Sequence, residues 1–256
     1  MKIITVANAA GSAGKTTTVV SLAAHLAERG RRVVVVYLDG QANSTRWFGL
    51  EPDELEATSA ALMLREATVE EAVVETNTEG VRLVPANEGV YADGIRLQQV
   101  TGREMRLATA LRNLKDTDVV LIDCPGTIGL MTVAALVASD AVITVTQPTS
   151  KELEGIGSLE ATIADVAEDF AKDLGLDAIV PCIVPAASSG ALYADAVAQL
   201  REAYGELVTP NVRRSVKAAG AYSHREPLPK FAPNEGVTRD YAAVLDALIE
   251  RGVIPA

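Results

Sequence analysis

Short runs of β-branched and aliphatic residues alternate along this chain with longer stretches that have helical periodicity. This alternation is typical of parallel strands joined by crossover helices, and a parallel sheet covered on both faces explains strands that are apolar throughout. The sequence therefore predicts an α/β fold: a doubly wound, mainly parallel sheet with helices on both faces. The expected strands are 3–7, 33–38, 81–85, 119–122, 141–145 and 178–184, and the expected helices are 16–29, 95–114, 130–137, 152–174, 191–204 and 236–251.

Composition narrows the class of protein further. With 256 residues, 48% of them hydrophobic, the chain is long enough to bury a large core, and we expect one domain over residues 1–256. The stretch 51–78, rich in Glu and Ala, is expected to form short exposed helices. No run approaches the roughly 18 apolar residues that cross a bilayer, so we expect a cytoplasmic protein that does not bind membranes. Cys124 and Cys182 lack metal-ligand spacing and are expected to be small buried hydrophobes.

The loop after the first expected strand has the pattern of a phosphate-binding loop. Small residues let the backbone curl, so that successive N–H groups and the N-terminus of the next helix form an anion cradle. Lys15 is expected to reach the β- and γ-phosphates of ATP, and the Thr16 hydroxyl to bind Mg²⁺. The first glycine of the usual pattern is Ala9, and an ordinary glycine-rich turn capped by Thr is the alternative. The expected nucleotide-binding residues are Gly11, Ser12, Ala13, Gly14, Lys15, Thr16 and Thr17.

Two acidic residues follow other expected strands. Asp39 comes after the run 33–38, and Asp123 comes after 119–122. Ligands of doubly wound sheets bind at the carboxyl ends of the strands, and phosphoryl transfer depends on positioning and charge stabilisation. Asp123 fits an acid on the metal side and Asp39 an acid that orients the attacking water. The candidate catalytic residues are therefore Lys15, Asp39 and Asp123, and the candidate metal-binding residues are Thr16, Asp39 and Asp123. A single Asp after a strand is more often a cap or turn former, but two such loops after a phosphate loop favour the site.

The motifs together resemble the ParA/MinD group of P-loop ATPases, and more specifically ParA-type partition ATPases. The resemblance implies ATP and Mg²⁺ as cofactors, an ATP-dependent homodimer with two nucleotides at its interface, nonspecific DNA binding, and stimulation by a ParB-like centromere-binding protein. It also implies a cytoplasmic, nucleoid-associated location. The similar stretches are 8–18, 21–23, 38–45, 118–126, 134–136, 147–155, 214–217, 227–228, 232–233 and 240–241.

The phosphate loop departs from this family at one important position. Where the family has a lysine that crosses the dimer interface to the partner's nucleotide, this chain has Ala10. Gly40 and Ala42 also replace the family's Pro and Gly after the Asp39 equivalent. By analogy with arginine fingers, loss of a cation acting across an interface lowers hydrolysis by about 10³- to 10⁵-fold. We therefore expect nucleotide binding with slow turnover, unless Lys151 or an arginine supplies the missing charge.

Basic residues outnumber acidic ones between positions 201 and 230, although the whole chain carries a net charge of −11. Uniform nucleic-acid binding is therefore disfavoured, and this segment is the candidate DNA surface, with Arg214, Lys217 and Arg225 as its proposed contacts. Arg214 and Lys217 are three residues apart and are expected to share a helical face. The alternatives are a solvated face of mixed charge and a MinD-like membrane helix, for which the C-terminus has too few basic residues.

Three functions compete. The leading hypothesis is an ATPase that partitions or positions DNA or other cargo through ATP-dependent dimerisation. The second is a scaffold of the same fold that is gated by nucleotide and impaired in hydrolysis. The third is a metabolic or metal-delivering P-loop enzyme, which is disfavoured because the two cysteines lack the spacing of cluster ligands.

Overall fold

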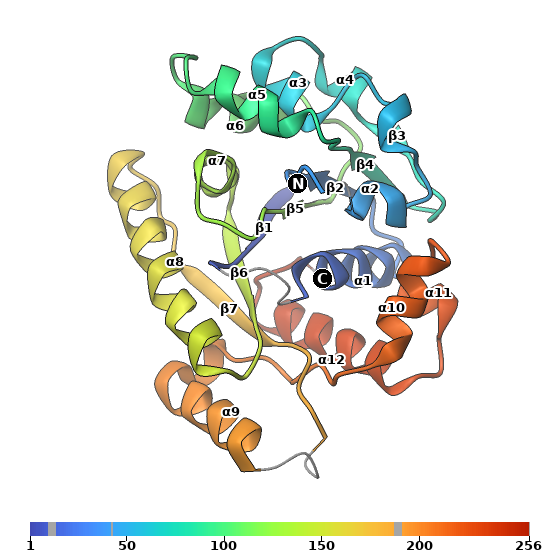
Figure 1. The fold of residues 1–256 in the computed structure, drawn as a ribbon, viewed down its shortest axis with the longest axis vertical. Helices are drawn as coiled ribbons and strands as arrows, with labels where there is room; N and C mark the ends of the chain where they lie inside the picture. The colour runs from blue at the N-terminus through green and yellow to red at the C-terminus, as the bar shows by residue number, and fades with distance from the viewer. Residues whose placement is uncertain (10–13, 42, 187–190, 256) are drawn as a thin grey trace.

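A computed structural model of the chain describes residues 1–9, 14–41, 43–186 and 191–255, and it contains a seven-stranded sheet (Figure 1). The strand order is β3-β4-β2-β5-β1-β6-β7, and every neighbouring pair is parallel except β3 with β4. The predicted doubly wound, mainly parallel sheet is confirmed. The strands are β1 (Lys2–Ala7), β2 (Val33–Tyr37), β3 (Val74–Glu75), β4 (Val81–Val84), β5 (Val119–Asp123), β6 (Ala141–Thr146) and β7 (Leu176–Pro181).

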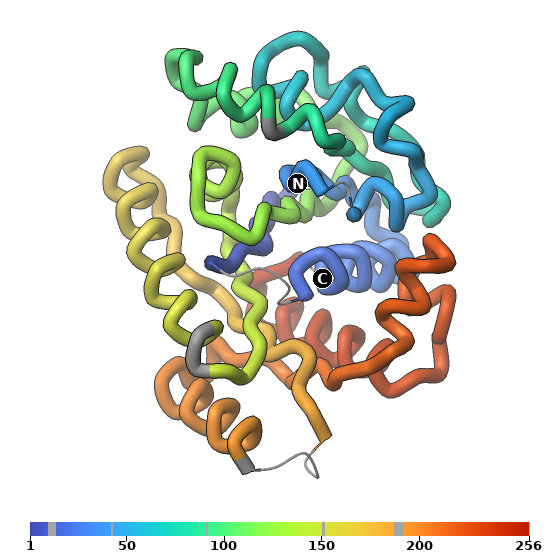
Figure 2. The backbone as a smooth tube through the Cα atoms, viewed as in Figure 1, coloured from blue at the N-terminus to red at the C-terminus, as the bar shows by residue number. Residues whose placement is uncertain are grey.

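Side chains of each strand alternate between two hydrophobic layers. In β2, Val33 and Val35 pack on one face, and Val34 and Val36 pack on the other. The first face is covered by α1 (Lys15–Glu28), α10 (Val216–Ser223), α11 (Leu228–Phe231) and α12 (Gly236–Glu250). The second is covered by α3 (Ser59–Leu64), α6 (Arg106–Leu111), α7 (Leu130–Ala138) and α8 (Ser150–Asp169). The first and last helices of the chain, α1 and α12, lie side by side in Figure 2, and both pack on the first face.

The predicted helix over 95–114 is wrong as a single element. The chain forms α5 (Val90–Leu97) and α6, separated by a turn and a short 3-10 helix, Arg103–Met105. Gly102 has φ 65°, a left-handed conformation that a continuous helix does not contain. The remaining helices are α2 (Asn43–Trp47), α4 (Val69–Ala72) and α9 (Ala191–Tyr204).

The segment 51–78 is only partly what its composition indicates. Short helices are present, but α3 is not exposed, because Leu62 and Met63 are buried against the second face of the sheet. The Thr58 side chain caps this helix by accepting a hydrogen bond from the Ala61 N–H. The segment then ends in the antiparallel edge strand β3, which the sequence analysis did not predict.

The candidate DNA segment contains a helix, α10, but the expected shared face is wrong. Ser215 is the N-cap of α10 and accepts a hydrogen bond from the Lys217 N–H. Arg214 therefore precedes the helix, whereas Lys217 lies in its first turn. Among the described residues, no helix has both the length and the apolar character that crossing a bilayer requires.

Candidate functional site

The carboxyl ends of β1, β2 and β5 lie side by side. In the sheet register, Asp123 of β5 pairs with Val6 of β1 on one side and with Tyr37 of β2 on the other. The loop after each of these neighbours carries a predicted site residue, because Asn8 follows β1 and Asp39 follows β2. The parallel register therefore brings together residues that are far apart in sequence, at the edge where ligands of such sheets bind.

Lys15 begins α1 and is 7% exposed. Its ammonium group donates a hydrogen bond to Asn8 Oδ1, and Asn8 Nδ2 donates in turn to the Val145 carbonyl of β6 at 3.1 Å. Burial lowers the pKa of Lys15, whereas Asp123, Cys124, Asp39 and Glu152 oppose that shift. Buried cations are found where they are paired, so this lysine is positioned by its surroundings. Asn8 was not predicted as a site residue, although it begins the stretch 8–18 that contains the phosphate loop.

Asp123 is completely buried, and burial raises its pKa to about 6. Hydrogen bonds from Thr16 and Ser44 and the charge of Lys15 counteract this shift, whereas Asp39 adds to it. Ser44 Oγ donates to Asp123 Oδ2 at 2.9 Å, but Oδ1 has no hydrogen-bond partner among the described residues. An oxygen atom this deeply buried needs a partner, and an oxygen beside a threonine hydroxyl suits Mg²⁺, which prefers oxygen ligands.

A cavity of about 290 Å³ opens above these residues. It is the place where the predicted Lys15, Thr16 and Asp39 converge. Asp39 is partly exposed, and its Oδ1 accepts a hydrogen bond from the Gln41 N–H at 3.0 Å. Larger cavities of about 340 and 550 Å³ lie elsewhere, so chemistry and not volume singles out this one. Its lining residues are Gly14, Lys15, Thr16, Thr17, Asp39, Cys124, Gly126 and Ile183.

Gly14 precedes α1 with φ 95°, a conformation that strains residues with a Cβ atom. The other glycine-loop predictions, Gly11, Ser12 and Ala13, lie outside the described residues, as does Ala10. Ala9 is described, and its Cβ would lie 3.3 Å from a Cβ added at Gly155 of α8. Helix α8 thus approaches the loop closely. The side chain of Lys151, the suggested substitute for the missing lysine, lies outside what the structure describes.

A chain of contacts connects the Asp39 loop to the C-terminal helices. Asn43 donates its N–H to the Tyr37 hydroxyl at 3.0 Å and accepts a hydrogen bond from the Tyr222 hydroxyl of α10 at 3.3 Å. The Trp47 and Tyr222 rings meet edge to face, with 5.4 Å between their centroids. Trp47 Nε1 also donates to the Glu226 carbonyl at 2.9 Å. The sequence offered no signal for this connection, because α2 and α10 are distant in the chain.

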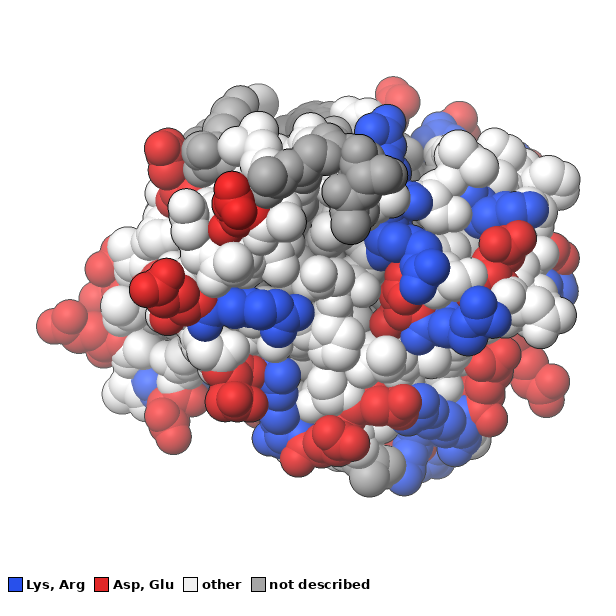
Figure 3. Space-filling view, turned by 90° about the horizontal axis from the view of Figure 1, so that it is seen from below, with Lys and Arg blue, Asp and Glu red and all other residues white. Residues whose placement is uncertain are grey.

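The three proposed DNA contacts differ in their surroundings. Lys217 forms an ion pair with Glu235 at 3.4 Å, and Arg225 forms one with Glu51 at 2.6 Å. Arg214 is exposed and has no ion pair among the described residues. Figure 3, which views the molecule from below Figure 1, shows Lys and Arg interleaved with Asp and Glu on that face. The described basic residues therefore do not form a continuous positive surface there.

Comparisons with known proteins identify the family of the chain. A family model described as an AAA domain matches residues 1–176. The sporulation initiation inhibitor protein Soj of Bacillus subtilis is 32% identical over 234 residues, 91% of this chain and 92% of Soj. The chromosome partitioning protein ParA of Myxococcus xanthus is 34% identical over 180 residues, 70% of this chain and 64% of that protein.

A solved structure matches almost the whole chain. The crystal structure of cobyrinic acid a,c-diamide synthase from Mycobacterium smegmatis is 31% identical, has a TM-score of 0.83, and aligns over 98% of this chain and 94% of that one. A second structure of that protein contains a bound ATP analogue and magnesium. With the matching family model and the partition-protein relatives, this chain belongs to the ParA/MinD family of P-loop ATPases.

Proposed function

We propose that this chain binds ATP with Mg²⁺ in the cavity above Lys15 and hydrolyses it slowly, in a cycle that partitions or positions DNA or other cargo. The observation that carries the proposal is that Lys15 and Asp123 are both buried and near enough for their charges to affect each other's pKa, while Asp123 Oδ1 lacks a hydrogen-bond partner among the described residues. Burial of two charged groups is costly unless a ligand or partner compensates them. A metal ion would satisfy the unpartnered Asp123 oxygen, and the triphosphate that it accompanies would lie within reach of the Lys15 charge.

Each residue has a distinct proposed role. Lys15 leaves Asn8 to contact the β- and γ-phosphates, and the N–H groups at the start of α1 hold the phosphate oxygens. Thr16 and Asp123 would hold Mg²⁺ through their side-chain oxygens. Asp39 orients the attacking water, since it is partly exposed at the cavity. When bound, Mg²⁺ neutralises charge on the phosphates.

Slow turnover follows from Ala10. The methyl group of alanine cannot supply the positive charge that family members place across the dimer interface, so the γ-phosphate loses that stabilisation. The alternative is a scaffold that binds nucleotide without efficient hydrolysis. The two differ in a single measurable quantity, the rate of phosphate release.

Three protein variants test this proposal. The parent protein should hydrolyse ATP slowly and form a weak ATP-dependent homodimer, and Ala10→Lys should strengthen that dimer. Asp39→Ala should lower turnover further and leave ATP affinity unchanged, because Asp39 acts on water and not on the phosphates. Sedimentation velocity and steady-state phosphate release measure these effects. A parent that dimerises tightly and turns over quickly contradicts the assigned role of position 10, and Lys151→Ala then tests whether that residue supplies the charge.

DNA binding is proposed as nonspecific, ATP-dependent and sensitive to salt. A protein with net charge −11 must join two weak patches by dimerisation to hold a polyanion. Asn43 and Trp47, which follow the loop that carries Asp39, contact Tyr222. These contacts connect the candidate nucleotide site to the segment that carries the proposed DNA contacts Arg214, Lys217 and Arg225. A ParB-like DNA-binding protein is the proposed stimulating partner, and it should raise the ATPase rate when added with DNA.

A second candidate function comes from the name of the Mycobacterium smegmatis protein. If this chain used ATP to activate a carboxylate for amidation, a carboxylic acid substrate with an ammonia donor should stimulate ADP formation and yield an amide. Incubation with cobyrinic acid, ammonium and ATP, followed by mass spectrometry, distinguishes the two functions. Amide product would favour the synthase.

A further inference from the structure

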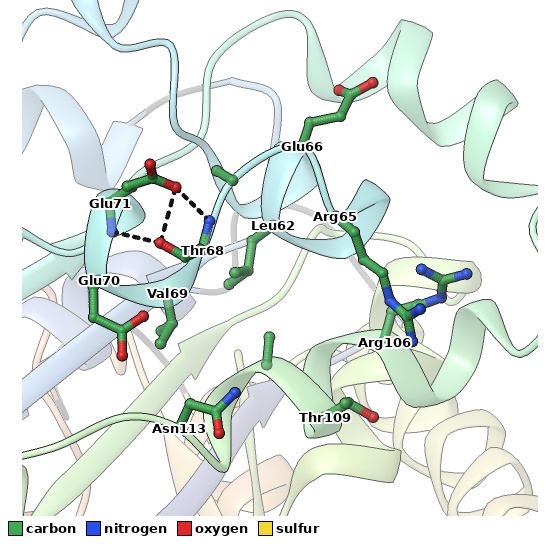
Figure 4. A pocket seen from close by; sticks show the side chains of 12 residues that line it. Leu62, Arg65, Glu66, Thr68, Val69, Glu70, Glu71, Arg106, Thr109 and Asn113 are labelled. Carbon is green, nitrogen blue, oxygen red and sulfur yellow. Dashed lines mark hydrogen bonds between the residues drawn. The ribbon is translucent and has the colours of Figure 1, made fainter.

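A cavity of about 340 Å³ lies away from the nucleotide site, between the turn that joins α3 to α4 and the outer side of α6 (Figure 4). It does not include any residue that lines the nucleotide cavity. The buried side chains of Leu62 and Val69 contribute an apolar wall. Arg65, Arg106, Thr109 and Asn113 add polar groups. This combination of an apolar wall and a few polar side chains is typical of sites for small molecules.

Two arginine side chains come together at one end of this cavity. Arg65 follows α3 and Arg106 begins α6, and in Figure 4 their guanidinium groups point toward one another. Arg65 ends its helix with φ 64°, and the turn it makes directs the side chain toward α6. Among the described residues, neither side chain forms an ion pair or a hydrogen bond. Two adjacent positive charges that lack a counter-ion repel each other.

The acidic residues around the cavity do not supply that counter-ion. Glu66 is engaged by Arg96, whose hydrogen bonds lower the pKa of the Glu66 carboxyl. Glu71 accepts hydrogen bonds from the Thr68 N–H and hydroxyl, both at 2.8 Å, as part of a capping box. In Figure 4 both carboxylates point away from the two arginines. Glu66 and Glu71 are thus held by other partners, and Glu70, the third acid that lines the cavity, forms no ion pair with either arginine among the described residues.

We propose that this cavity, called the arginine pocket below, binds a small phosphate monoester with an apolar body. Guanidinium groups recognise phosphate with paired hydrogen bonds, and a dianionic phosphate matches two positive charges. The apolar body would lie along Leu62 and Val69. Glu66, Glu70 and Glu71 line the same cavity, so an extended polyanion would pass close to several carboxylates, whereas a small phosphate monoester can contact the two arginines alone. This site is separate from the proposed ATPase function.

Phenyl phosphate is a suitable probe, because it combines a dianion with a small apolar ring. Its binding is measured by calorimetry with the full chain in excess ADP and Mg²⁺, and again with the Lys15→Ala variant, so that the phosphate loop does not contribute. We expect saturable binding to one site, weakened about tenfold or more by Arg106→Gln and by Arg65→Gln, since each removes a charged hydrogen-bond donor. Arg112→Gln is the matched control: Arg112 is an exposed arginine at the end of α6 outside the pocket.

Each result of these binding measurements either supports or overturns the arginine pocket. Arg112→Gln should leave phenyl phosphate affinity unchanged, and benzoate, a monoanion with the same ring, should bind more weakly. Lack of saturable phenyl phosphate binding, or equal binding by the Arg65 and Arg106 variants and the parent, overturns the arginine pocket. Equal affinity for benzoate overturns the choice of a phosphate. Unfolding temperatures of the variants, measured in parallel, show whether a lost signal comes from lost structure.

Discussion

The edge of the sheet that carries the candidate nucleotide site and the basic segment 201–230 differ in whether their charged side chains are buried or exposed. At the edge, Lys15 and Asp123 are buried, and Asp123 keeps an oxygen without a hydrogen-bond partner among the described residues. In the segment, Lys217 and Arg225 are exposed and already paired with acids. Burial of charge costs free energy, whereas an exposed ion pair contributes about 0 to 1 kcal/mol. A buried, incompletely satisfied charge is therefore stronger evidence for a ligand than a count of surface cations.

The largest expected effect is on ATP affinity. Lys15→Ala removes the side-chain cation that the proposed site places against the phosphates, so ATP should bind at least about 100-fold more weakly, as expected for the loss of charged hydrogen bonds. Lys217→Ala removes the same charge from the surface and should leave ATP affinity unchanged. Calorimetry on both variants makes the comparison. Equal ATP affinity in Lys15→Ala and the parent would remove the basis of the site.

Asp123→Asn should separate stability from binding. Because burial raises the pKa of Asp123 from 3.8 to about 6, its contribution to stability is favourable below pH 3.8 and is lost as pH rises to about 6. Replacing it by the neutral amide should therefore raise the free energy of unfolding of the nucleotide-free protein by up to about 3 kcal/mol at pH 7 and by little at pH 4. Urea titrations at the two pH values measure this. The same variant should lose Mg²⁺-dependent ATP binding. A destabilised variant at pH 7 contradicts the shift.

The ion pairs of Lys217 and Arg225 predict that neutralising their acidic partners strengthens DNA binding. If the segment contacts DNA, Glu235→Gln and Glu51→Gln should strengthen DNA binding several-fold at low salt, because they release Lys217 and Arg225 from their ion pairs. Arg214→Ala should weaken it by a similar factor. Fluorescence anisotropy across a salt series reports both the affinity and its slope. Identical salt curves for all three variants and the parent would place the DNA surface elsewhere.

The smallest effect is expected at the connection between the two regions. Tyr222→Phe keeps the ring against Trp47 and removes only the 3.3 Å hydrogen bond to Asn43, so stability should fall by about 1 kcal/mol or less. If this contact transmits the nucleotide state, ATP should enhance DNA binding less in the variant than in the parent. Tyr193→Phe, on α9, is the matched control. Unchanged ATP enhancement in Tyr222→Phe excludes the contact as the path.

Sequence reasoning named residues that the structure brings to one cavity, because short motifs and the order of the strands indicate them. Strand ends followed by Lys15, Asp39 and Asp123 meet whenever the sheet is parallel. The same reasoning predicted one helix over 95–114, because the helical periodicity continues across the turn at Gly102. It also predicted exposed helices over 51–78, although Leu62 of α3 is buried against the sheet. It also placed Arg214 on a helix that begins only after Ser215, since capping determines where a helix starts.

The sequence by itself determined the fold class, the phosphate loop and the identity of the residues at the carboxyl ends of the strands. These properties depend on hydrophobic periodicity and on short motifs, which are written along the chain. Only the tertiary structure decided that Asn8 holds Lys15, that Ser44 binds Asp123, that Lys217 and Arg225 are paired, and that Arg65 and Arg106 converge. Each of these contacts joins residues whose spacing in sequence carries no signal, because packing of distant elements alone sets the distance between their side chains.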